Sequence, residues 1–150
     1  MENTYNKDLH LVEVMDKHFD AKVWSPPIPI LLHSGYWNTM GVDRHTSGVY
    51  KYFLKDKLVY IGMSERSIFG RTRAFVNHVE FMITGYRRCN ESHAKRFVTS
   101  LGYQMEDLKD MTVSYCPVHS KLARSMENHL INQFVKGEGN GGYPILNARG

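Results

Sequence analysis

Apolar residues recur at helical spacing in some parts of the chain and form strand-like runs in others. Intervals of three and four residues predict amphipathic helices at about Leu9–Phe19, Ser67–Thr84 and Ser120–Val135, and a more polar helix is expected near Ser92–Leu101. Runs rich in valine and aromatic residues predict two antiparallel strands, GVYKYF and KLVYIG, and a further strand in MTVSYCPV. The pattern therefore predicts a hairpin, a third strand and several helices.

Three prolines, Pro26, Pro27 and Pro29, interrupt this pattern in the segment WSPPIPILLHSG. Proline fixes φ and lacks the backbone N–H donor, so the segment is not expected to be helical. We expect it to lie extended over the body of the protein, with Tyr36 and Trp37 beneath it.

The loop between the two hairpin strands decides where their tyrosines face. A two-residue turn pairs Tyr50 with Ile61 and sends Tyr60 to the other face of the hairpin. A loop of odd length pairs Tyr52 with Tyr60 and places Tyr50 diagonally beside them. Tyrosines are common in strands and can simply pack. An active site that uses both Tyr50 and Tyr60 requires the odd loop.

The helix after the hairpin has an apolar face with polar residues along its edge. At about 100° per residue, the apolar face contains Ile68, Phe75, Val79 and Met82. Arg71 and His78 lie two turns apart along the edge, whereas Arg73 points the opposite way. Arg71 is therefore expected to reach inward, and Arg73 to face solvent or a phosphate backbone. Edge arginines are also common as plain surface residues.

Glu127 is the polar residue that does not fit the pattern of the last helix. It falls inside the apolar stripe formed by Leu122, Ala123, Met126, Leu130, Ile131 and Phe134. Burying a carboxylate costs several kcal/mol unless a cation or hydrogen-bond donors meet it. We therefore expect Glu127 to bind a metal, Arg71 or a lysine, with a structural ion pair as the alternative.

Composition adds only broad limits. A chain of 150 residues fits one domain, and its 42% hydrophobic and 23% charged residues are ordinary for a globular protein. The first ten residues lack the basic start and apolar block of a secretory signal, which favours a cytoplasmic protein with unbridged Cys89 and Cys116. A net charge of +4 and a pI near 9.1 would attract a polyanion, although solubility alone also explains them.

Five elements in order resemble the GIY-YIG nuclease family. They are GVY at 48–50, YIG at 60–62, an arginine in the following helix, ENHLINQF from Glu127, and Asn147 in PILN. The resemblance covers residues 47–150, about two thirds of the chain, and leaves 1–46 as an N-terminal extension. It implies an α+β fold in which helices flank a small antiparallel sheet of about three strands.

The resemblance also implies a function, namely metal-dependent hydrolysis of DNA phosphodiester bonds. It assigns water activation to Tyr50 or Tyr60, transition-state stabilisation to Arg71, one Mg²⁺ or Mn²⁺ to Glu127, and a phosphate or glutamate contact to Asn147. A phenol titrates near about 10, so it acts as a base at neutral pH only if a cation favours its deprotonation. One ion is expected because the sequence shows no cluster of carboxylates for two.

The chain departs from the family pattern in three places. Arg71 lies one residue farther from YIG than in many members, and Arg73 competes for its role. Phe75 occupies a position where many members have histidine or tyrosine, and His78 is expected to replace it as base or phosphate contact. The interval before Asn147 is longer than usual and contains the glycine-rich insertion KGEGNGG.

Other interpretations stay open. Cys89, His93, Cys116 and His119 offer zinc-ligand types at spacings short of a familiar framework. The basic pairs Arg87–Arg88 and Lys95–Arg96 are expected either to contact DNA or to lie in solvent. The extension could read sequence, form a homodimer or complete the core. A nuclease fold that binds nucleic acid without cutting it is the alternative function.

Overall fold

The computed structural model describes residues 24–35, 44–85 and 92–147. The predicted helix at 9–19 lies outside these described residues, as do Tyr36, Trp37, Cys89 and the pair Arg87–Arg88.

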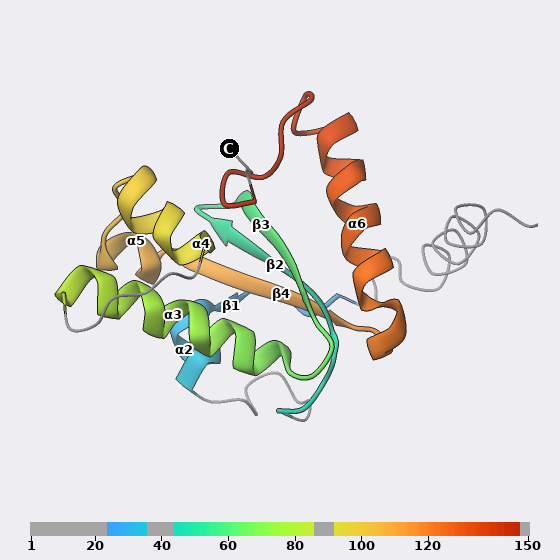
Figure 1. The fold of residues 1–150 in the computed structure, drawn as a ribbon, viewed down its shortest axis with the longest axis horizontal. Coiled ribbons are helices and arrows are strands. Elements are labelled where there is room, and N and C mark those ends of the chain that lie inside the picture. Colours follow the sequence, from blue (N-terminus) through green and yellow to red (C-terminus); the bar gives the residue numbers. More distant parts are fainter. Residues whose placement is uncertain (1–23, 36–43, 86–91, 148–150) are drawn as a thin grey trace, which may run out of the picture.

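A four-stranded antiparallel sheet forms the centre of an α+β fold (Figure 1). Its order is β1-β4-β2-β3, built from β1 (Ile28–Pro29), β4 (Met111–Pro117), β2 (Gly48–Leu54) and β3 (Lys57–Ser64). The three strands expected from the sequence are confirmed. The two-residue β1 was not predicted, because so short a pairing has no periodicity of its own.

The β2–β3 hairpin combines features of both predicted registers. Its turn has two residues, Lys55 and Asp56, with φ values of 49° and 66°, and Leu54 pairs with Lys57. A β-bulge after Tyr52 then shifts the register by one residue, so that Tyr52 pairs with Tyr60 and Tyr50 with Gly62. The tyrosines therefore adopt the arrangement expected of an odd loop, although the turn itself is even.

Two long helices pack against the hairpin from different sides. Helix α3 (Ile68–Thr84) contributes Phe75 and Val79 to a core shared with Tyr50 and Tyr52. Helix α6 (Ser120–Lys136) contributes Met126 and Leu130 to a second core with Val49 and Ile61. Because neighbouring residues of a strand point to opposite faces, the two helices cover opposite faces of the hairpin.

Three shorter helical segments complete the described part of the fold. Helix α4 (Ser92–Lys95) continues into a π-helical turn at Arg96–Ser100, and α5 (Met105–Lys109) precedes β4. Helix α2 (Ile30–Gly35) follows β1, so the prediction that this proline-rich segment is not helical was wrong beyond Pro29. The three prolines precede the helix, and a proline before the first turn removes no bond that the helix needs. Ile30 and His33 are buried, and the His33 ring packs edge-on against Phe69 of α3.

Within the described residues, no helix has both the length and the apolar character needed to cross a bilayer.

Candidate active site

The glycines of the two hairpin motifs make room for close packing. A Cβ added to Gly62 would lie 2.6 Å from Cζ of the Tyr50 ring and 2.7 Å from its hydroxyl oxygen. A Cβ added to Gly48 would clash with the carbonyl oxygen of Cys116 in β4. Gly62 thus lets the Tyr50 ring lie close against β3, and Gly48 lets β2 approach β4.

Three tyrosines form one aromatic cluster on the face of the hairpin that α3 covers. Ring centroids of Tyr52 lie 5.3 Å from those of both Tyr50 and Tyr60, and the Tyr50 and Tyr60 centroids are 6.1 Å apart. Tyr50 and Tyr52 are buried, whereas Tyr60 is half-buried. Of the two tyrosines expected to activate water, only Tyr60 has solvent access.

Arg71 and Glu127 both act electrostatically on the Tyr50 hydroxyl. Burial raises the pKa of Tyr50 well above its ordinary value, and Tyr52, Tyr60 and Glu127 act in the same direction while Arg71 opposes them. A cation from α3 and a carboxylate from α6 therefore both influence the ionisation of one phenol. Because burial outweighs Arg71, Tyr50 is a neutral hydroxyl at neutral pH and not a phenolate base.

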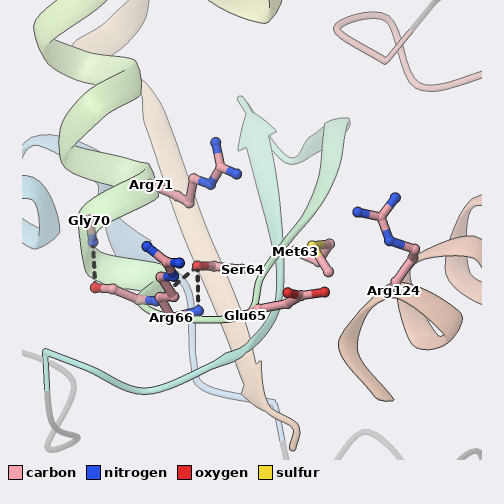
Figure 2. Close-up of a pocket in the computed structure, with 8 residues that line it drawn as sticks. Met63, Ser64, Glu65, Arg66, Gly70, Arg71 and Arg124 are labelled. Carbon is pink, nitrogen blue, oxygen red and sulfur yellow. Dashed lines mark hydrogen bonds between the residues drawn. The ribbon is translucent and has the colours of Figure 1, made fainter. Parts of the chain in front are cut away.

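An open pocket of about 400 Å³ lies where β3 leads into α3 (Figure 2). Its lining residues are Met63, Ser64, Glu65, Arg66, Ser67, Gly70, Arg71 and Arg124. Figure 2 shows Arg71 projecting from α3 and Arg124 from α6, on either side of the end of β3. Three arginines against one glutamate give this arginine pocket a formal charge of +2 (+3 − 1). Guanidinium groups suit phosphate, to which they donate paired hydrogen bonds.

The floor of the arginine pocket is held by serine side chains. The buried Ser64 hydroxyl oxygen accepts hydrogen bonds from the backbone N–H groups of Arg66, at 3.2 Å, and Ser67, at 2.8 Å. Ser67 is the N-cap of α3, and its hydroxyl accepts from the Gly70 N–H at 2.8 Å. These bonds fix the backbone positions from which the side chains of Arg66 and Arg71 extend.

Glu127 is half-buried on α6, directly after the buried Met126. Arg124 lies three residues earlier, on the same side of the helix. Among the residues that the structure describes, no group of three or more His, Cys, Asp or Glu side chains is placed to hold a metal. A single carboxylate fits one Mg²⁺, which keeps several waters and is often bound through one or two carboxylates.

Asn147 fastens the C-terminal segment to the outer edge of β3. The Ile61 N–H donates to its Oδ1 at 2.8 Å, and its Nδ2 donates to the Ile61 carbonyl oxygen at 2.8 Å. The Leu146 N–H also donates to the carbonyl oxygen of Val59 at 2.8 Å. Asn147 thus acts as a partner for the edge strand, a role not expected from the sequence. Its contact with a phosphate or with Glu127 stays a prediction.

A histidine that was not assigned to the active site, His93, lies against Tyr60. The His93 ring stacks on Tyr60, with centroids 4.7 Å apart, and on Phe75, at 5.2 Å. His78 lies seven residues beyond Arg71, which is about 10 Å along the helix axis and away from the arginine pocket. No spacing in the sequence links His93 with Tyr60, because α4 and β3 meet only in the folded chain.

The remaining predicted contacts are spread over the surface. Arg73 and Lys95 are exposed, and neither lines the arginine pocket. The exposed Arg124 completes this pocket but was not singled out from the sequence. Arg124 lies on the polar side of α6, and nothing in the sequence around it indicates that it shares a pocket with a residue of α3.

The three described members of the possible zinc site do not converge. Cys116 is fully buried in the core under α6, and burial raises its pKa to about 11. His93 packs on the opposite face of the hairpin, and the exposed His119 uses its Nδ1 to accept a hydrogen bond from the Lys121 N–H at the start of α6.

Comparisons with protein-family models, with curated proteins and with solved structures give no match to this chain.

Proposed function

We propose that the protein is a divalent-metal-dependent endonuclease that hydrolyses DNA phosphodiester bonds. The observation that carries this proposal is that the charges of Arg71 on α3 and Glu127 on α6 both act on the Tyr50 hydroxyl of β2, while Arg71 also lines the arginine pocket. The motif order GVY, YIG, Arg, Glu and Asn supports the same assignment.

Each residue has a role that its position permits. The arginine pocket would bind the phosphate, and Arg71 would stabilise the negative charge that grows on its oxygens. Glu127 would hold one Mg²⁺, which when bound supplies Lewis-acid polarisation of the phosphate. The buried Tyr50 would donate a hydrogen bond through its neutral hydroxyl, whereas the half-buried Tyr60, stacked on His93, would orient the attacking water.

A binding module that holds nucleic acid without cutting it is the rival function. The raised pKa of Tyr50 favours it, since this phenol is not a base at neutral pH. The two functions share the arginine pocket but differ in what Glu127 does.

A plasmid-nicking assay separates them. We expect the wild-type protein to convert supercoiled plasmid to nicked circles with Mg²⁺ or Mn²⁺ and to leave it intact in EDTA. Glu127→Gln should lower the nicking rate by at least about 100-fold, as expected for loss of a metal ligand, with DNA affinity nearly unchanged. Glu106→Gln, an exposed carboxylate on α5, is the matched control and should nick normally. Binding without nicking by the wild-type protein would instead establish the binding module.

A further inference from the structure

A second pocket lies on α6 and has a different chemistry from the arginine pocket. It has a volume of about 280 Å³ and is lined by Asn128, Ile131, Asn132, Tyr143 and Asn147. Three of these five residues carry a side-chain amide, which presents a donor and an acceptor together. We refer to these five residues as the asparagine pocket.

The asparagine pocket has a fixed rim and an available aromatic ring. Asn147 is held by its two hydrogen bonds to Ile61, so its side of the pocket is tied to the edge of the sheet. Tyr143 is 53% exposed, although large aromatic side chains are usually well covered. Its ring therefore offers an open face that the fold does not use.

The two pockets follow one another along α6. Arg124, Asn128 and Asn132 recur every four residues, so they lie along one side of the helix over about 12 Å, with Glu127 next to Asn128. A nucleic-acid strand presents charged phosphates and flat polar bases in alternation. Along α6, the arginine suits a phosphate, the amides and the aromatic ring suit a base, and the carboxylate lies between them.

We propose that the asparagine pocket binds a nucleobase of the nucleotide next to the phosphate held by the arginine pocket. This inference rests on the proposed function, since it takes nucleic acid as the ligand. Asparagine amides pair with the donor and acceptor edges of bases, most completely with adenine, and exposed tyrosine rings stack on bases in single strands. The protein thus distinguishes bases at one position and prefers adenine there.

Binding without cleavage tests this inference. Fluorescence anisotropy in EDTA would compare the affinity of the wild-type protein for labelled single strands of deoxyadenosine, of deoxycytidine and of abasic backbone, all at one salt concentration. We expect the adenine strand to bind about tenfold more tightly than the abasic strand.

Variants at exposed positions locate the preference. Asn128→Ala combined with Asn132→Ala should remove the discrimination between adenine and cytosine strands, and Tyr143→Ala should lower the affinity for both strands toward that for the abasic strand. Tyr143→Phe keeps the ring and should keep the affinity. Gln133→Ala, an exposed amide on the same helix outside the pocket, is the matched control.

The outcomes separate this inference from the proposed function. Equal affinity of the wild-type protein for adenine and abasic strands, or a base preference that persists in the double asparagine variant, overturns the base pocket, whatever the nicking assay gives. A base preference that depends on Asn128 and Asn132, without any nicking, supports the base pocket and removes the hydrolytic activity alone.

Discussion

The burial of Tyr50 determines what its hydroxyl can do. The ring is 1% exposed and lies across Gly62, so water does not solvate a phenolate at this position. Arg71 favours ionisation, but desolvation and the neighbouring groups outweigh it. The motif tyrosine is thus better suited to donate a hydrogen bond than to remove a proton.

The raised pKa of Tyr50 makes the stability of the protein fall at alkaline pH. Because the pKa of Tyr50 is higher in the folded than in the unfolded protein, its contribution is complete below about pH 10 and is lost as the pH rises further. Tyr50→Phe has no proton to lose. Urea unfolding from about pH 9 to pH 11 should therefore show the wild-type protein losing about 1 kcal/mol more than the variant.

Tyr143→Phe removes an exposed phenol and serves as the control. Its stability should depend on pH in the same way as that of the wild-type protein. Parallel stability curves for the wild-type protein and Tyr50→Phe would show that the Tyr50 phenol titrates normally.

At the scale of elements, the β2–β3 turn holds two non-glycine residues with positive φ. Lys55 and Asp56 have φ values of 49° and 66°, the conformation for which tight hairpin turns prefer Asn-Gly. Asp56→Gly should relieve this strain and raise the free energy of unfolding by about 0.5–1 kcal/mol. Chemical denaturation measures the change. The control Lys57→Gly, in the adjoining strand, should lower the free energy of unfolding. A decrease for both variants would mean that the turn is not strained.

The elements differ in how far the sequence predicts them. Helices α3 and α6 are long enough for their apolar periodicity to define them, and Glu127 was noticed because it breaks that periodicity. The β-bulge after Tyr52 has no local signature, so the register of the hairpin stayed open until the fold was known. Helix α5 spans only five residues and shows no usable period.

The site residues follow the same division. Arg71 lies at the edge of an apolar face and could be singled out from its own helix, although its side chain is exposed and does not reach inward as expected. Arg124 and His93 could not be inferred in this way, because the position of each matters through a side chain far away in the sequence. Arg124 lies across the pocket from Arg71, and His93 stacks on Tyr60.

At the scale of the whole molecule, the edge strand β3 brings these parts together. The arginine pocket forms where β3 leads into α3, and α6 packs against β3 from the other face (Figure 1). The C-terminal segment joins the outer edge of the same strand through Asn147. The shape of the asparagine pocket therefore depends on how firmly this segment is held, because Tyr143 and Asn147 belong to it.

Asn147→Ala tests that dependence. The substitution removes two 2.8 Å hydrogen bonds and leaves the partly buried N–H and carbonyl of Ile61 without their partner, which should lower the free energy of unfolding by about 1–3 kcal/mol. Hydrogen exchange should show faster exchange of the Ile61 amide, because Asn147 accepts its proton. Asn128→Ala, an exposed change at the same pocket, should leave stability within about 0.5 kcal/mol of wild type. An Ile61 amide that stays equally protected in Asn147→Ala would mean that the segment is held to β3 by its apolar residues, and that Asn147 is available for the phosphate contact expected from the sequence.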